Sequence, residues 1–220
     1  MSASMLFSLV SQATGQTLIM VFASTVFSLI LGLPLGILLC VTDPVSGITP
    51  KPLLYQVLTR IVNILRSFPF IILMILLFPL SRIIVRTSIG TTATIVPLSI
   101  AAAPFIARII ETALKEVDPG VIQAARAMGS TNMQIIVKVL LPEAMPSLVS
   151  GITLTIINLI GYSAMAGAIG GGGLGDLAIR YGYQRFRTDV MIAAVVVILV
   201  LVELIQLAGT KISAALLAKR

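Results

Sequence analysis

Residues 123–142 read QAARAMGSTNMQIIVKVLLP and form a polar segment between two long apolar runs of the chain. Because the flanking runs are apolar enough to lie in a membrane, we expect this segment to leave the bilayer. Gly129 interrupts the helical pattern, Ser130 or Thr131 can cap a second helix, and Pro142 is expected to end that helix. The segment therefore predicts two short helices, joined at Gly129, that are presented to a soluble partner.

The composition places the chain in a membrane. Of its 220 residues, 58% are hydrophobic and 10% are charged, and the mean hydropathy is +1.10. Soluble domains are only about 45–50% apolar, so we expect an integral membrane protein. The net charge of +7 comes without a basic run, which argues against nucleic acid as a partner. The chain has one cysteine, Cys40, and no histidine, so neither a disulfide nor a metal site is predicted.

Five apolar segments approach the roughly 20 residues that a helix needs to cross a bilayer. They are residues 17–41, 61–80, 89–110, 147–169 and 190–208. These segments predict an all-α integral membrane protein with five transmembrane helices.

The distribution of lysine and arginine predicts the orientation of these helices. With the N-terminus outside, the inner face holds 10 basic residues: Lys51, Arg60, Arg66, Arg108, Lys115, Arg126, Lys138, Lys211, Lys219 and Arg220. The outer face holds 5: Arg82, Arg86, Arg180, Arg185 and Arg187. Basic residues are enriched on the cytoplasmic side of membrane proteins. We therefore expect an N-out, C-in topology, with residues 123–142 in the cytoplasm.

The polar segment resembles the signature loop of bacterial ABC-import permeases, which reads EAA, three residues, Gly, nine residues and then I-x-LP. Gln123 replaces the Glu and Val139 replaces the Ile, whereas the alanine pair, the glycine spacing and the Leu-Pro end match. The resemblance implies a cytoplasmic coupling loop, at approximately residues 114–145, that docks on an ATPase. The docking residues it implies are Gln123, Ala124, Ala125, Arg126, Gly129, Leu141 and Pro142.

A second segment, residues 66–73, reads RSFPFIIL where the chain is expected to enter the membrane. Pro69 can weaken a helix there, so Arg66 and Pro69 are candidates for a hinge or bend near a transport path. The alternative is that Arg66 anchors the span at the inner leaflet, with its guanidinium among the headgroups. The sequence of this segment is similar to that of the methionine-import branch of the ABC permeases.

A third segment reads GYSAMAGA at residues 161–168 and continues as GGGGLG at residues 170–175. Its small residues allow helices to approach closely, and the glycines permit unusual backbone conformations. One interpretation is a gate or path lining, with a mobile outer loop at residues 176–187; the other is tight helix packing followed by a loop. The segment closely resembles methionine-uptake permeases. The gate residues predicted from it are Tyr162, Ser163, Met165 and Gly167.

The family resemblance implies an assembly. A methionine-import permease has a type I importer fold, and we expect residues 1–220 to form one such transmembrane domain in the bacterial cytoplasmic (inner) membrane. The implied partners are a second copy of the chain, two cytoplasmic ABC ATPase subunits, an extracytoplasmic substrate-binding (lipo)protein, and L- or D-methionine or both as substrate. No Walker A sequence occurs in the chain. We therefore expect no catalytic residues and no cofactor, with ATP bound by the partner.

Two other function classes compete with this interpretation. Glu203 is the one acidic residue deep in a predicted span, and intramembrane carboxylates mark ion-coupled transporters and channels. The alternative is a buried or interfacial pairing, because Glu203 lies within about two helical turns of the cytoplasmic end. Such transporters often contain inverted repeats, however, and no repeat is visible here. An intramembrane serine protease would need a base for Ser163, and histidine is absent.

Arg108 and Glu111 have the spacing of an ion pair within one helix.

The topology can be tested with single cysteines in a Cys40→Ser background. Cysteines replacing Ser4 and Gln184 are expected to react with a membrane-impermeant thiol reagent added outside. A cysteine replacing Ser130 is expected to react only after permeabilisation. Labelling of Ser130→Cys in intact cells would place the polar segment on the outer face and contradict the ABC-permease interpretation.

Overall fold

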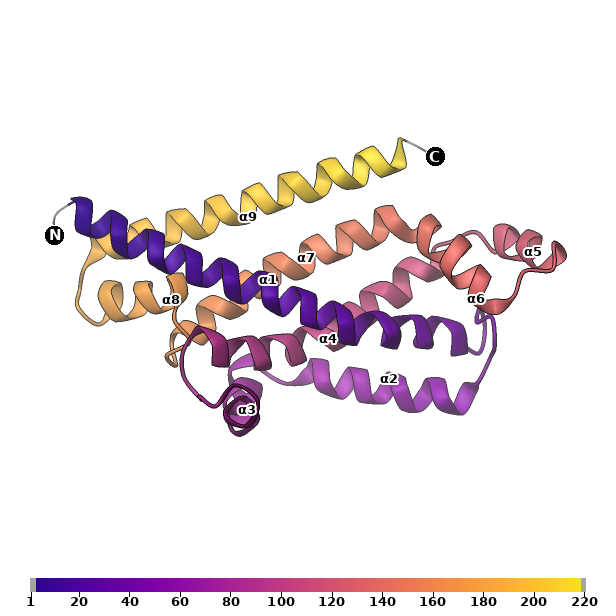
Figure 1. The fold of residues 1–220 in the computed structure, drawn as a ribbon, viewed down its shortest axis with the longest axis horizontal. Helices are drawn as coiled ribbons and strands as arrows, with labels where there is room; N and C mark the ends of the chain where they lie inside the picture. Colours follow the sequence, from indigo (N-terminus) through magenta and orange to yellow (C-terminus); the bar gives the residue numbers. More distant parts are fainter. Residues whose placement is uncertain (1–2, 219–220) are drawn as a thin grey trace. The chain divides into compact units, whose positions relative to one another are not determined.

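The computed structural model describes residues 3–218, and all regular secondary structure within them is helical (Figure 1). The four longest helices are α1 (Ala3–Thr42), α4 (Thr91–Lys115), α7 (Leu141–Gly167) and α9 (Thr188–Leu217). The shorter ones are α2 (Pro52–Ser67), α3 (Phe70–Val85), α5 (Pro119–Ala127), α6 (Asn132–Ile135) and α8 (Gly173–Leu177), with π-helical segments η1 (Ile136–Leu140) and η2 (Ala178–Tyr183). Lys219 and Arg220, which count toward the predicted orientation, lie outside the described residues.

The expected membrane spans are present, with one correction. Four helical stretches are long and apolar enough to cross a bilayer: Ser4–Thr42, Thr91–Lys115, Asn132–Gly167 and Thr188–Leu217. The segment predicted as a single helix at residues 61–80 is instead broken at Phe68 and Pro69, between α2 and α3. Proline lacks an N–H and disfavours a helical conformation at the preceding residue. If α2 and α3 count together as one broken span, the chain has five.

The chain divides into two compact units, and the four long helices contribute to both. Unit 1 contains the described residues up to Ser28, together with Phe68–Ala102 and Thr155–Gln206. Unit 2 contains Leu29–Ser67, Ala103–Leu154 and the described residues from Leu207 onward.

In unit 1, buried apolar side chains from four helices form the main core. Met20 of α1, Met74 of α3, Leu98 of α4 and Leu159 of α7 are all almost fully buried in it. Buried hydroxyl groups within the helices bond to backbone carbonyls: Thr25, for example, donates to the carbonyl of Val21 at 2.8 Å. Such bonds satisfy polar groups that would otherwise be costly inside a membrane.

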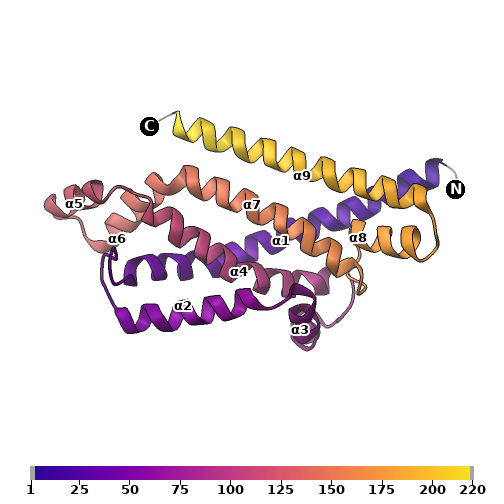
Figure 2. The same ribbon diagram turned by 180° about the vertical axis from the view of Figure 1, so that it is seen from behind.

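Unit 2 is held by a close contact between α1 and α4. A Cβ atom added at Gly32 would lie 2.8 Å from the carbonyl oxygen of Ala103, and one at Gly36 would lie 2.6 Å from that of Ala107. The two glycines are four residues apart, which is the spacing that lets membrane helices approach closely. In both views α2 also runs beside the second half of α1 (Figure 1 and Figure 2), where Val62 is buried with Leu39.

Above this contact, unit 2 contains a buried carboxylate with three donors. Glu111 of α4 is only 2% exposed. It accepts hydrogen bonds from Arg108 at 2.5 Å, Lys115 at 2.8 Å and the hydroxyl of Tyr55 at 2.9 Å. The ion pair expected from the spacing of Arg108 and Glu111 is thus confirmed. Arg108 also donates to the side-chain oxygen of Asn63 at 3.0 Å, which joins α2 to α4.

Lys115 extends this network to the loop between α1 and α2. Its ammonium group lies 2.5 Å from a carboxylate oxygen of Asp43. Asp43 also accepts the backbone N–H groups of Val45 and Ser46, each at 2.8 Å. Burial alone would raise the pKa of Asp43, but the hydrogen bonds from Lys115, Ser46 and Val45 hold that pKa well below its usual range. The Glu111 network, defined as Asp43, Tyr55, Arg108, Glu111 and Lys115, therefore joins three segments of unit 2.

Removing the shared cation should destabilise the protein. Lys115→Met would leave Asp43 and Glu111 close together without their common donor. Breaking a buried ion pair costs about 3–5 kcal/mol, and because Lys115 is 29% exposed we expect the lower end, about 3 kcal/mol. The apparent melting temperature in detergent should fall by about 6–12 °C. The control is Lys138→Met, since Lys138 is exposed and makes no ion pair with another described residue. An equal shift in both variants would contradict this role of Lys115.

Candidate functional site

The polar segment folds as two short helices whose ends are fixed by local hydrogen bonds. Asp118 caps α5 by accepting the N–H of Gly120 at 2.7 Å, and Pro119 occupies the first turn. Thr131 caps α6, and its side chain and backbone exchange hydrogen bonds with Gln134. The predicted cap at Thr131 is confirmed. In both views α5 and α6 lie together at the ends of α4 and α7 (Figure 1 and Figure 2).

Gly129 makes the turn between these helices, as the sequence predicts. Its φ is +79°, in the left-handed region that residues with a side chain rarely adopt. A Cβ atom at this position would meet no other atom of the chain within 4 Å. The turn therefore requires glycine for its backbone conformation, and the space beside it is open.

Pro142 does not end the second helix, which corrects the sequence-based prediction. The helix continues from Asn132 through η1 and α7 to Gly167. The π-helical segment η1 lies directly before Pro142, which occupies the second position of α7. A wider π turn changes the hydrogen-bond spacing of a helix. Proline has no N–H to donate, but it is tolerated in the first turn of an α-helix, where that donor is not needed. The helix thus runs without a break from α6 into α7.

Two of the predicted docking residues are used inside the chain. Ala125 is only 3% exposed and packs in the core cluster of unit 2 with Leu114 and Ile135. Its methyl group is therefore not available for docking on a partner. Leu141 is also partly buried against this cluster. Gln123, Ala124, Arg126, Gly129 and Pro142 are exposed.

The loop also exposes large apolar side chains that sequence reasoning missed. Met128 is 80% exposed and Met133 is 68% exposed, and Val121 and Val137 are exposed as well. We call these four residues the apolar loop surface. Exposed apolar groups mark protein contacts where they lie outside the bilayer, as we expect for this segment, and methionine adapts well to a partner's surface. Met128 and Met133, which lie on either side of Gly129 in the sequence, could have predicted this surface.

The loop is also fastened to the α1–α2 connection. Arg126 donates to the backbone carbonyl of Ile48 at 2.9 Å, and Asn132 donates to the hydroxyl of Thr49 at 3.2 Å. The same connection begins at Asp43, which binds Lys115. Hydrogen bonds therefore hold α5 and α6 to unit 2 at one side, while Ala125 and its neighbours hold them at the other.

The predicted gate segment at the end of α7 lies in unit 1, and most of it is packed. The ring of Tyr162 stacks on Phe70 with centroids 4.6 Å apart. Ser163 is 2% exposed and donates to the carbonyl of Ile160 at 2.7 Å. A Cβ atom on Gly167 would collide with the backbone of Gly175. Met165 alone among the four predicted gate residues has an exposed side chain. For the other three, the structure shows the tight packing that was the alternative interpretation.

Residues 176–183, most of the outer loop expected at residues 176–187, are helical. Gly170, Gly172 and Gly173 have positive φ values, and α8 and η2 follow directly. The backbone N–H groups of Gly173 and Leu174 donate to the side chains of Gln16 and Thr17, each at 2.9 Å. The side chains of α1 thus accept hydrogen bonds from backbone N–H groups at the start of α8 that have no partner within that helix.

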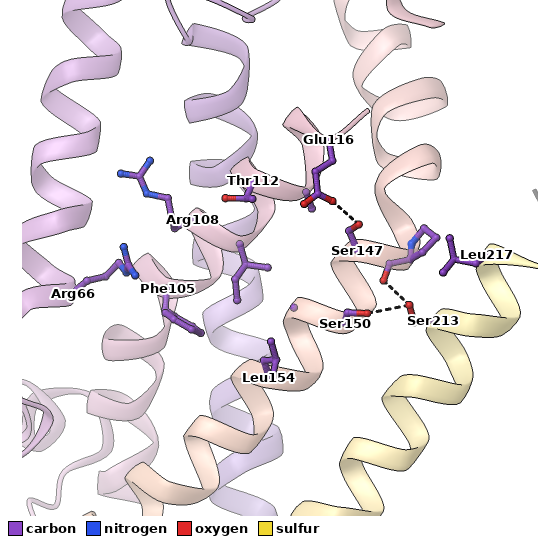
Figure 3. A pocket seen from close by; sticks show the side chains of 14 residues that line it. Arg66, Phe105, Arg108, Thr112, Glu116, Ser147, Ser150, Leu154, Ser213 and Leu217 are labelled. Carbon is purple, nitrogen blue, oxygen red and sulfur yellow. Dashed lines mark hydrogen bonds between the residues drawn. The ribbon is translucent and has the colours of Figure 1, made fainter. Parts of the chain in front are cut away.

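Arg66 and Pro69 lie on opposite sides of the break between α2 and α3. Pro69 immediately precedes α3, so it lies outside the helix that it was expected to weaken. Arg66 reaches a cavity of about 470 Å³ in unit 2, and its guanidinium lies 5.7 Å from the ring centre of Phe105. Figure 3 shows Arg66 and Arg108 at one side of this cavity and Ser147 and Ser150 at the other.

Comparisons with known proteins match nearly the whole chain. The family described as "Binding-protein-dependent transport system inner membrane component" matches residues 32–218. A "Probable D-methionine transport system permease protein MetI" from Vibrio cholerae is 50% identical over 197 residues, covering 90% of this chain and 87% of the relative. The "D-methionine transport system permease protein MetI" of Escherichia coli K12 is 55% identical over 152 residues, covering 69% of this chain and 70% of the relative.

Solved structures show the same fold. A chain from an inward-facing conformation of the MetNI methionine ABC transporter has a TM-score of 0.95 and 50% identity, with 98% of this chain and 99% of that chain covered. A chain from an amino acid ABC transporter has a TM-score of 0.72 at 20% identity, with 97% and 95% covered, which is a likeness of fold alone. The chain thus belongs to the family of binding-protein-dependent transport system inner membrane components.

Proposed function

We propose that this chain is the membrane-spanning permease subunit of an ATP-driven ABC importer for methionine, in its L form, its D form or both. The relatives at 50–55% identity carry the name of a D-methionine transport permease. The solved chain of the same fold belongs to a methionine ABC transporter. The likeness to that solved chain extends over 98% of this chain and 99% of the other.

In the proposed assembly, two copies of the chain enclose the path and two cytoplasmic ABC ATPases bind the loops between α4 and α7. An extracytoplasmic substrate-binding (lipo)protein delivers the substrate. The chain is the non-catalytic subunit, and the partner ATPases bind the ATP. The N-terminus lies outside and the C-terminus inside, and the whole chain acts as one transmembrane domain.

The apolar loop surface is the observation that carries the proposed coupling role. Met128 and Met133 are among the most exposed large side chains of unit 2, yet they lie on a segment fixed from two sides. An apolar surface outside the bilayer is stable when a partner covers it. A rigid base below that surface allows the partner's movement to be transmitted rather than absorbed by the loop.

The geometry supports a mechanism in which ATPase closure displaces the loop. Arg126 and Asn132 connect the loop to the α1–α2 connection, which Asp43 and Lys115 connect to α4. The unbroken helix from α6 connects the loop to α7. Movement of α7 then reaches the gate segment, where Met165 lies at the path. Tyr162, Ser163 and Gly167 keep the end of this helix in shape through their packing contacts.

Transport by purified components tests the function. The chain, the ATPase and the binding protein, reconstituted in proteoliposomes, should take up radiolabelled methionine when ATP is present on the ATPase side. A proton gradient without ATP should drive no uptake. Uptake driven by the gradient alone would contradict the proposal and favour an ion-coupled secondary transporter or channel.

Polar replacement of the two methionines should weaken ATPase docking. Burial of one methionine side chain contributes about 1.5–3 kcal/mol, so Met128→Ser with Met133→Ser should cost about 3 kcal/mol, or roughly a hundredfold in affinity. Co-purification of the ATPase measures the loss. The control is Phe186→Ser, because Phe186 is equally exposed but follows η2, on the predicted outer side. Unchanged co-purification of the double variant would show that this surface is not the docking site.

The space beside Gly129 provides a separate test. Gly129→Asn keeps a short side chain that tolerates positive φ, whereas Gly129→Arg adds a long one. A Cβ atom at this position meets no other atom of the chain within 4 Å, although the positive φ strains any residue other than glycine, and arginine more than asparagine. An ATPase fitted against this turn should therefore tolerate Asn and lose about 1–3 kcal/mol of binding with Arg, or roughly tenfold or more. Equal ATPase stimulation by substrate in the two variants would contradict close docking at the turn.

A further inference from the structure

Glu203 lies deep in the most apolar helix of the chain. Asp189 and Lys211 are 22 residues apart in α9, or about 33 Å at a rise of about 1.5 Å per residue. This matches the roughly 30 Å thickness of a bilayer's hydrocarbon core. Glu203 precedes Lys211 by eight residues, which places it about 12 Å inside the core. A glutamate side chain is too short to reach the headgroups from there.

Glu203 also lies at the centre of the exposed face of α9. Ile192, Val196 and Leu199 are exposed and precede it at helical spacings of 11, 7 and 4 residues. The other side of the helix packs within unit 1, where Val190 and Ala194 are fully buried. The carboxylate thus points away from its own unit.

Within residues 3–218, Glu203 makes no hydrogen bond or ion pair. An ionised carboxylate facing lipid at this depth is costly, so intramembrane acids face the interior of an assembly or water. An ionised Glu203 is therefore unsuited to face lipid.

The four long helices of a second copy offer Glu203 no free cation at this depth. The basic residues in the described parts of the four long helices are Arg108, Lys115 and Lys211. Arg108 and Lys115 already bind Glu111, and Lys211 lies near the end of its helix. An ion pair with the four long helices of a second copy is therefore not the partner that Glu203 needs.

We propose that Glu203 faces the water-filled transport path and binds the ammonium group of the amino-acid substrate. This inference rests on the proposed function, because an amino acid is the cargo that carries a cation into the path. The carboxylate would attract the ammonium group and replace part of its hydration. The apolar residues of the same face, among them Leu199, would line the path beside the substrate's uncharged side chain.

Thiol labelling tests where Glu203 points. Glu203→Cys and Leu204→Cys are made in a Cys40→Ser background and assembled with the ATPase and binding protein in proteoliposomes. The two positions have nearly the same depth but lie about 100° apart around the helix. The probe is a membrane-impermeant trimethylammonium thiosulfonate. The proposal expects Glu203→Cys to react about tenfold faster or more, corresponding to about 1.4 kcal/mol. Labelling of Glu203→Cys no faster than that of Leu204→Cys would overturn it.

Transport by two further variants tests the ammonium site itself. Glu203→Gln removes the charge, so the initial rate of methionine uptake should fall about tenfold at low substrate concentration, because a neutral contact replaces a charge-assisted one. Glu203→Asp should retain more uptake than Glu203→Gln, and both should bind the ATPase normally. Wild-type uptake by Glu203→Gln would overturn the ammonium site. Absence of ATP-driven uptake in the wild-type protein would instead contradict the proposed function, and the labelling result is read independently of uptake.

Discussion

Glu111 is the buried charge on which the rest of unit 2 depends. A carboxylate that is 2% exposed is stable only if donors satisfy it, and here one oxygen binds Arg108 while the other accepts from Lys115 and Tyr55. These donors come from α2 and α4, and Lys115 passes the connection on to Asp43. The loop that follows Asp43 then accepts Arg126 from α5. The buried charge thus links α2 and α4 to the α1–α2 connection, which in turn binds α5.

The membrane imposes a second constraint, because polar groups inside it must find their hydrogen-bond partners within the chain itself. The hydroxyl groups of Thr25 and Ser163 donate to carbonyls of their own helices. Gly32 and Gly36 let α1 approach the backbone of α4 without leaving a gap. Glu203 departs from this pattern, since it is ionisable, deep and unpaired within residues 3–218. Exceptions of this kind mark functional positions in membrane proteins.

Local features of the sequence predicted much of the fold. The apolar segments identify the long helices, and the glycine and threonine of the loop identify its turn and cap, because these signals depend on neighbouring residues alone. The break at Pro69 was also recognised as a local weakness, but its size was underestimated. Pro142 misled for a related reason: a proline near the start of a helix resembles a stop signal, and the π-helical segment before it is not visible in the sequence.

Burial could not be predicted in the same way. Ala125 and Ala124 are chemically identical, yet one is in the core and the other is exposed, because α5 docks on α4 and α7 through one side. Ser163 was assigned to a path because it is polar, whereas its own helix satisfies its hydroxyl group. The partners of Lys115 lie 72 and 4 residues away, so only the nearer one was within reach of pattern reasoning.

We propose that the α5–α6 loop moves together with the rest of unit 2 as one rigid body. Spin labels at Leu53→Cys on α2 and Ala127→Cys at the end of α5, in a Cys40→Ser background, report the distance across unit 2. Both positions are exposed, and dilution with unlabelled copies isolates the distance within one chain. We predict one narrow distance distribution by pulsed electron paramagnetic resonance, unchanged between the nucleotide-free and the ATP-bound transporter. A distribution that broadens or shifts when ATP binds would show that the loop bends at its base, and would contradict the account.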